Sequence, residues 1–152
     1  MNSLTLQQLI PVIQTAVGPV ILISGVGLLL LSMTNRFGRV VDRSRILARE
    51  LPAAGPAERD FLAAQLRILY RRARIIRFAI ILAIASVLLA GLLIISLFLA
   101  ALLHLEAARV VALCFILCMV ALVGAVIGFR LDLQVSLTAL RVELAQAGFH
   151  PQ

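Results

Sequence analysis

Few side chains in this sequence have a type and spacing suited to chemistry. Cys114 and Cys118 lie four residues apart, on one face of any helix, and Met119 follows directly. Two thiolates and a thioether are ligands for a soft metal such as Cu(I). No third strong ligand accompanies them, so we interpret both cysteines as small apolar side chains. We predict neither a metal site nor a cofactor.

Patterns typical of enzymes are missing from the sequence. It has no phosphate-cradling glycine loop, nucleophile elbow, zinc-type His/Cys spacing or paired carboxylates. His104, Glu106 and Arg109 lie close together, and we interpret them as a polar turn that satisfies helix ends in water. We therefore expect no catalytic residue and no enzymatic activity.

Arginine is the chemically prominent residue type. Eleven of the fourteen arginines lie between Asn35 and Arg77, and lysine is absent. Arginines beside a bilayer bind anionic head groups, and repeated around an oligomer axis they would attract anions. A third interpretation is docking of an acidic protein, although the sequence identifies no protein partner. Aromatic residues are sparse in the block, which argues against nucleic acid. The arginines expected to contact lipid or anions are Arg36, Arg39, Arg71, Arg72, Arg74 and Arg77.

Apolar residues make up 62% of the chain and are concentrated in runs. Three runs, residues 17–34, 75–103 and 110–129, are each suited to a hydrocarbon core of about 30 Å, which needs about 20 helical residues. Helix is the expected form, because lipid cannot satisfy an open sheet edge. The sequence thus predicts an all-α integral membrane protein with three transmembrane helices.

The arginines also predict the topology. The first loop holds eleven of them, whereas the second connection holds only Arg109. By the positive-inside rule the first loop is cytoplasmic, which puts the N-terminus outside and the C-terminus in the cytoplasm. The inverted topology is the alternative. The absence of ionisable residues at mid-depth argues against a proton-coupled pump.

The first span begins irregularly, with Pro11 and then Gly18-Pro19. Proline removes a backbone donor and clashes with the preceding turn. We weigh a separate short helix over residues 5–16 at the outer interface against one kinked span. Gln14 and Thr15 are the best candidates for lining a polar vestibule there.

Helical periodicity continues beyond the spans. Residues 35–74 are predicted to form a cytoplasmic, arginine-rich helical hairpin, and residues 130–147 a C-terminal helix; together with the spans these make a single domain, 1–152. The first hairpin arm has a seam of Val40, Ser44, Leu47 and Leu51. The C-terminal helix carries two apolar stripes on different faces, so one is left for a second copy. We predict a homo-oligomer with the seam Leu133, Leu137, Leu140 and Leu144.

Small residues are expected where helices approach closely. Gly124 and Gly128 form a small-x3-small motif, which suits packing within one chain or between chains. Gly18 and Gly25, with Ser24 and Ser32, give the first span a small and hydroxyl-bearing set. If this set faces a shared axis, a channel is favoured; if it faces the chain's own spans, a scaffold is favoured.

Several runs resemble an uncharacterised family of small bacterial multi-pass membrane proteins, catalogued as a domain of unknown function. These runs are residues 18–24, 28–31, 35–45, 69–77 and 137–141. Most specific is the pattern Asn-Arg-x2-Arg-x2-Asp-Arg-x-Arg over residues 35–45. The resemblance covers most of the chain and implies a bacterial inner-membrane protein. It brings no established activity or site residue.

Two functions follow as hypotheses. The first is a non-enzymatic inner-membrane protein that self-assembles through its helices and presents an arginine-rich cytoplasmic bundle to lipid or protein partners. The second is a homo-oligomeric ion channel, with a positive cytoplasmic vestibule and an apolar constriction that opens by wetting.

Overall fold

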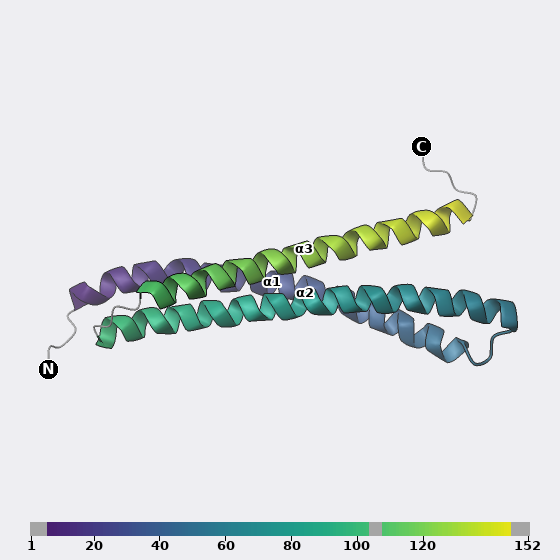
Figure 1. Cartoon of the computed structure of the whole chain (residues 1–152), viewed down its shortest axis with the longest axis horizontal. Coiled ribbons are helices and arrows are strands. Elements are labelled where there is room, and N and C mark those ends of the chain that lie inside the picture. The colour runs from purple at the N-terminus through teal and green to yellow at the C-terminus, as the bar shows by residue number, and fades with distance from the viewer. Residues whose placement is uncertain (1–5, 104–107, 147–152) are drawn as a thin grey trace. The chain divides into compact units, whose positions relative to one another are not determined.

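The computed structural model describes residues 6–103 and 108–146, and its side chains are described over residues 10–56, 58–103 and 108–135. Three helices account for nearly all of these residues: α1 (Leu6–Glu50), α2 (Pro56–Leu103) and α3 (Ala108–Gln146) (Figure 1). The described ranges contain no strand. The all-α prediction is confirmed, and all three helices are long and apolar enough to cross a membrane.

Each helix is much longer than a bilayer requires. The helices contain 45, 48 and 39 residues, which at 1.5 Å per residue gives roughly 60–70 Å. A hydrocarbon core of about 30 Å therefore accounts for only part of each one. The remainder continues as helix into a region where arginines are frequent.

The separate short helix over residues 5–16 is not found, because α1 runs without a break from Leu6 through Pro11 and Pro19. Each proline removes one backbone donor, whereas a full break would expose several unpaired N–H and C=O groups in an apolar setting. The hydroxyl of Thr15 donates to the carbonyl of Pro11 at 2.8 Å, as hydroxyls near prolines in membrane helices commonly do.

A short turn joins α1 to α2. The last turn of α1 is followed by bonds from the amide of Leu51 to the Leu47 carbonyl and from Ala53 to Glu50, both 3.1 Å. The Arg59 guanidinium donates to the carbonyls of Leu51 (3.4 Å) and Pro52 (3.3 Å). It thereby satisfies acceptors that the helix end leaves open, and its charge complements the negative end of the helix dipole.

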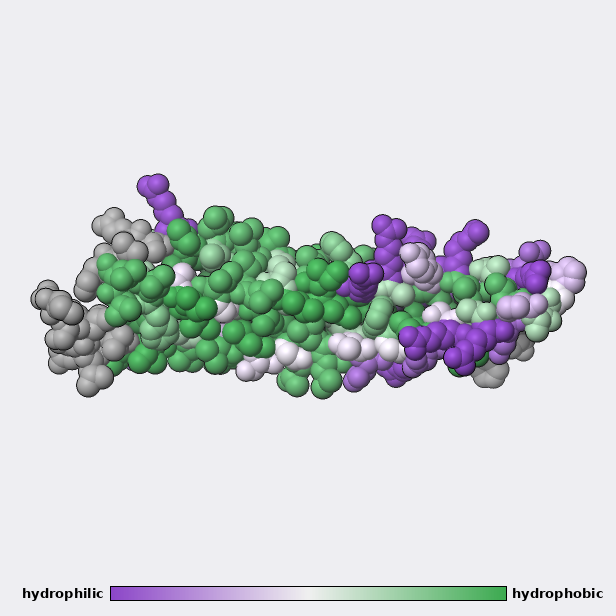
Figure 2. Space-filling view, turned by 90° about the horizontal axis from the view of Figure 1, so that it is seen from below, coloured by the Kyte–Doolittle hydropathy of each residue, from purple (hydrophilic) through white to green (hydrophobic). Residues whose placement is uncertain are grey.

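Contacts group the described residues into two compact units. Unit 1 comprises residues up to Leu31 together with Ile81–Gly124, and unit 2 comprises Ser32–Ile80 together with the residues from Ala125 onward. The prediction of a single domain stays a prediction. On the face seen in Figure 2, apolar side chains cover unit 1, whereas charged side chains gather over unit 2.

The core of unit 1 is built from small residues. On α2 the buried positions follow a spacing of three and four, which is the spacing of a coiled-coil seam. Small side chains let helix backbones approach closely, which matters in lipid because association there depends on packing. The buried residues of this unit are Ala16, Val26, Ala83, Ser86, Ala90, Leu93, Cys118 and Ala121.

Unit 2 has a core of larger side chains and one carboxylate. Met33, Val40 and Leu47 recur every seven residues on α1 and are buried; Ser44 and Leu51 of the expected hairpin seam are half-buried. Leu62, Ile76 and Ala79 of α2 are buried, as are Ala125 and Asp132 of α3.

The two glycines of α3 meet α2 at very short range. A Cβ at Gly128 would lie 3.0 Å from the Cβ of Ala79 and 3.6 Å from its Cα, in unit 2. A Cβ at Gly124 would lie 3.0 Å from Cδ1 of Leu82, in unit 1. The Leu82 methyl can rotate away, whereas Ala79 can yield only by moving its backbone. Both glycines therefore lie against α2 of the same chain.

Replacing Gly128 with alanine should destabilise the protein. An added methyl in such a tight contact typically costs about 1–3 kcal/mol, which outweighs the gain of about 1 kcal/mol from alanine's higher helix propensity. Thermal unfolding in detergent, followed by circular dichroism, measures the effect.

Gly27→Ala is the matched control, because nothing lies within 4 Å of its Cβ position. It should leave stability unchanged or raised, and Gly124→Ala should fall between the two. Equal stability of Gly128→Ala and Gly27→Ala would contradict the close approach to Ala79.

Candidate anion-binding site

A buried aspartate organises the polar part of unit 2. Asp132 is fully buried and lies seven residues after Ala125 on α3, at the spacing of that helix's core face. A polar residue at a single core position of a helical seam fixes the register of the helices at a cost in stability. Asp132 is not among the residues predicted from the sequence, because the leucine stripes dominate the pattern of the same segment.

Arginines from two helices compensate the carboxylate. The Nε of Arg36, on α1, lies 3.4 Å from Oδ2, and the Nε of Arg72, on α2, lies 3.4 Å from Oδ1. The Arg72 contact is also a hydrogen bond, whereas Oδ2 has no hydrogen-bond partner among the described residues. The arginine side chains are 24% and 15% exposed and that of Asp132 is 0% exposed, so all three charges are largely removed from water.

Arg36 has a second contact, with an aromatic ring. Its guanidinium carbon lies 5.5 Å from the centroid of the Phe129 ring, within the range of a cation–π interaction. Phe129 precedes Asp132 by three residues on α3, so ring and carboxylate present themselves one helical turn apart. The two contacts hold the Arg36 side chain against α3.

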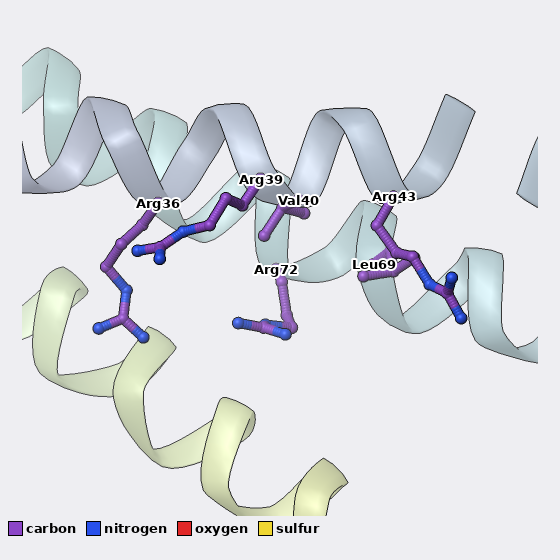
Figure 3. A pocket seen from close by; sticks show the side chains of 6 residues that line it. All are labelled: Arg36, Arg39, Val40, Arg43, Leu69 and Arg72. Carbon is purple, nitrogen blue, oxygen red and sulfur yellow. The ribbon is translucent and has the colours of Figure 1, made fainter. Parts of the chain in front are cut away.

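These arginines border a cavity of about 410 Å³ in unit 2. Its lining residues are Arg36, Arg39, Val40, Arg43, Leu69 and Arg72. Figure 3 shows Arg36 extending from α1 toward α3, with the guanidinium ends of Arg39 and Arg72 on the same side and Arg43 extending the other way. Three guanidinium groups thus gather on one side of the space, beside a single buried carboxylate, while that of Arg43 extends away.

The six predicted lipid-contact arginines divide into two groups. Arg36 and Arg72 are half-buried and paired with Asp132. The other four, Arg39, Arg71, Arg74 and Arg77, are exposed. Only the exposed group is free to meet a membrane surface without disturbing the core.

The remaining predicted packing residues differ in their surroundings. Gly18 and Gly25 are exposed, with nothing within 4 Å of a Cβ at either position. Leu133 is half-buried. Leu137, Leu140 and Leu144 lie on α3, but their side chains are outside the described part of the chain. His104 and Glu106 of the predicted polar turn also lie outside the described residues.

The cysteines occupy structural surroundings in unit 1. The thiol of Cys118 donates to the Ser86 carbonyl at 3.2 Å, and the Ser86 hydroxyl lies 3.4 Å from the same sulfur. Cys114 is half-buried and also free. Where side chains are described, no group of three or more His, Cys, Asp or Glu residues could hold a metal ion.

Several hydroxyls of the apolar helices bond to a carbonyl of their own helix. Ser24 donates to the Val20 carbonyl at 3.3 Å, and Ser96 to that of Leu93 at 2.8 Å. Such bonds are expected where the surroundings offer no water. Among the described side chains of unit 1 we find no polar cluster suited to chemistry, whereas unit 2 has the aspartate and its arginines.

Comparison with known proteins gives a family without an assigned role. The family described as "Protein of unknown function (DUF2721)" matches residues 16–142. No curated protein and no solved structure matches the sequence.

Asp132→Ala should lower the free energy of unfolding by about 3–5 kcal/mol, because it leaves two half-buried guanidinium groups without their counter-charge. Chemical or thermal unfolding in detergent, followed by circular dichroism, measures the loss. Glu50→Ala removes an exposed carboxylate and should change stability by less than about 1 kcal/mol. Equal effects of the two substitutions would show that the buried pairs do not hold unit 2 together.

Proposed function

We propose that this chain, which belongs to the DUF2721 family of proteins of unknown function, is a non-enzymatic integral membrane protein. It self-assembles and binds anionic lipid through unit 2, its basic unit. The observation that supports this proposal is the contrast between the exposed side chains of the two units. Unit 1 exposes large apolar side chains on all three helices, and unit 2 exposes arginines.

Lipid is the natural surrounding for unit 1. Ile21, Leu28 and Val120 are 67%, 72% and 64% exposed, and they represent a larger set along all three helices. A soluble monomer rarely exposes contiguous apolar surface on this scale. Hydrocarbon would cover these side chains at no cost, while the helices satisfy their own backbone groups.

The arginines support contact with a negatively charged leaflet. Arg71, Arg74 and Arg77 are exposed and lie where the long apolar run of α2 begins. Each arginine close to an anionic surface contributes about 1 kcal/mol of attraction. The same distribution supports a topology with the N-terminus outside and the C-terminus in the cytoplasm, and the family resemblance implies the bacterial inner membrane.

Self-assembly is supported by a small-residue face on α1. Gly18, Gly25 and Ser32 recur every seven residues and are exposed, as is Ser24. Gly18 borders a cavity that residues of α2 and α3 in the same chain also line. Nothing lies within 4 Å of a Cβ at Gly25, so the open part of the face is centred on Gly25. Another helix could approach closely there, and a second copy of this chain would supply it.

The same observation favours the channel as a second candidate. A small, hydroxyl-bearing face that is open around Gly25 is what a shared axis would require. Several copies around that axis would bring their arginines together as a positive vestibule, next to a mainly apolar constriction.

Neutralising the exposed arginines next to the span should weaken lipid selectivity. The variant Arg71→Gln/Arg74→Gln/Arg77→Gln should retain at least about tenfold less phosphatidylglycerol relative to phosphatidylcholine, given about 1 kcal/mol per arginine. Native mass spectrometry of lipid retained from mixed nanodiscs measures the ratio.

The control removes the same charge farther from the apolar runs, with Arg45→Gln/Arg49→Gln/Arg67→Gln. Its effect should be small, because charges more than about 8 Å from the surface are largely screened at physiological salt. Equal losses in both triple variants would argue against a membrane-proximal belt.

Gly25→Leu should reduce cross-linking between copies in proteoliposomes at least about fivefold, since a bulky side chain prevents close helix approach. Gly91→Leu is the control, because Gly91 also has open space at its Cβ but lies on α2, outside this face. Unchanged cross-linking in Gly25→Leu would exclude this face as the interface.

Ion flux from the same vesicles separates the two candidates. Permeability above that of empty vesicles, lost in Gly25→Leu, would establish the channel. Permeability equal to that of empty vesicles under varied voltage and tension would exclude it and leave the self-assembling lipid-binding protein.

A further inference from the structure

We propose that the cavity of unit 2 is a specific site for a phosphate ester carried on an apolar stem. The inference rests on the proposed function, since it assigns a ligand class to the basic unit. It goes beyond a diffuse attraction to membranes, because it names one pocket. The arginines of this pocket are distinct from the exposed belt of Arg71, Arg74 and Arg77.

The charge around the cavity is unbalanced. Arg36, Arg39, Arg43 and Arg72 line it, and Asp132 is the one acid paired with any of them in the part of the chain with described side chains. Like charges around one cavity repel one another unless an anion joins them. Arg36 and Arg72 are also largely withdrawn from water. This strengthens the repulsion between their charges and the stabilisation that a bound anion would give.

Asp132 orients its two arginines for a ligand. Both contacts use the Nε atoms of Arg36 and Arg72. A guanidinium has five N–H donors, so the terminal Nη groups of both side chains are not used in these ion pairs. Two guanidinium groups fixed at one edge and open at the other match the fork geometry that binds phosphate oxygens.

Arg39 and Arg43 complete the set from α1. Neither has an ion pair among the residues whose side chains are described. They lie three and seven residues after Arg36, and both line the cavity. The Arg39 guanidinium is on the side of Arg36 and Arg72, whereas that of Arg43 extends the other way (Figure 3). A phosphate with one or two negative charges would meet several charge-assisted donors at once.

The rest of the cavity lining is apolar and would contact the apolar stem of the ligand. Val40 and Leu69 provide the remaining wall, and Val40 is 6% exposed. A volume of about 410 Å³ is within the range of small-molecule sites, about 300–1,000 Å³. It exceeds what an inorganic anion needs, and it would accept a phosphate together with the first part of its alcohol. A phospholipid head group and a soluble phosphate ester share this chemistry.

The test compares two charge-matched double variants of the full chain. Arg39→Gln/Arg43→Gln removes the pocket arginines that do not pair with Asp132, so the core keeps its ion pairs. Arg45→Gln/Arg49→Gln removes the same charge from exposed positions on the same helix, outside the cavity.

Two arms distinguish the source of the phosphate. In the soluble arm, glycerol 3-phosphate is titrated into protein in a non-ionic detergent by isothermal calorimetry, with sodium chloride at equal ionic strength as the blank. In the lipid arm, nanodiscs of phosphatidylcholine contain either phosphatidic acid or phosphatidylglycerol at equal surface charge, and retained lipid is measured by native mass spectrometry.

The wild-type protein should bind saturably in at least one arm. The pocket variant should lose at least about tenfold in affinity in that arm, since hydrogen bonds to charged groups are the strong ones. The Arg45/Arg49 control should change by less than about threefold. Binding in the lipid arm alone identifies a membrane phosphate as the source, and binding in the soluble arm alone identifies a free phosphate ester.

Two results would overturn the site. One is the absence of saturable binding by the wild-type protein in both arms, and the other is an equal loss in the two double variants. Neither result would contradict the proposed function, because retention of phosphatidylglycerol by the belt of Arg71, Arg74 and Arg77 is measured separately. Conversely, loss of that belt effect with saturable pocket binding intact would refute the belt and keep the site.

Discussion

The burial of the Asp132 carboxylate constrains unit 2 more than any other contact. A carboxylate removed from water costs several kcal/mol, and only well-placed positive groups can offset that cost. Arg36 and Arg72 supply them from two different helices, so α1, α2 and α3 must all keep one register. A shift of one residue along any of them would turn a guanidinium away by about 100°. Apolar side chains tolerate such slips more easily, because dispersion and the hydrophobic effect have little directionality.

This requirement also decides what the arginines can do. Two of those that border the cavity are committed to the core through their Nε atoms, and the others stay available. A row of arginines beside apolar helices would ordinarily be a solvated face that interacts weakly and without selectivity. Fixed by a buried acid and facing a cavity of about 410 Å³, the same side chains acquire defined geometry. Geometry is what separates a binding site from a general attraction to anions.

Unit 1 obeys a different constraint. Its core positions are mostly alanine, serine and cysteine, and its large apolar side chains point outward. In lipid, outward apolar side chains cost nothing, and small inward ones allow close helix contact. The exposed Gly25 departs from this arrangement, because it is a small residue with open space around its Cβ position. That departure is the physical ground for expecting another copy of the chain at α1.

The sequence by itself determined the helical class, the three apolar spans and the seam of Val40 and Leu47, because these depend on periodicity and composition along one chain. It also showed that most arginines are concentrated between residues 35 and 77. It did not reveal that α1 continues through Pro11 and Pro19, since the tolerance of a proline depends on its surroundings. It did not single out Asp132, although the spacing from Ala121 and Ala125 through Gly128 was a usable signal. Which arginines are paired and which are free depends on charges that lie 60 and 96 residues from Asp132. Only the tertiary structure brings those charges together, because electrostatic pairing acts through space and carries no periodic signature along the chain.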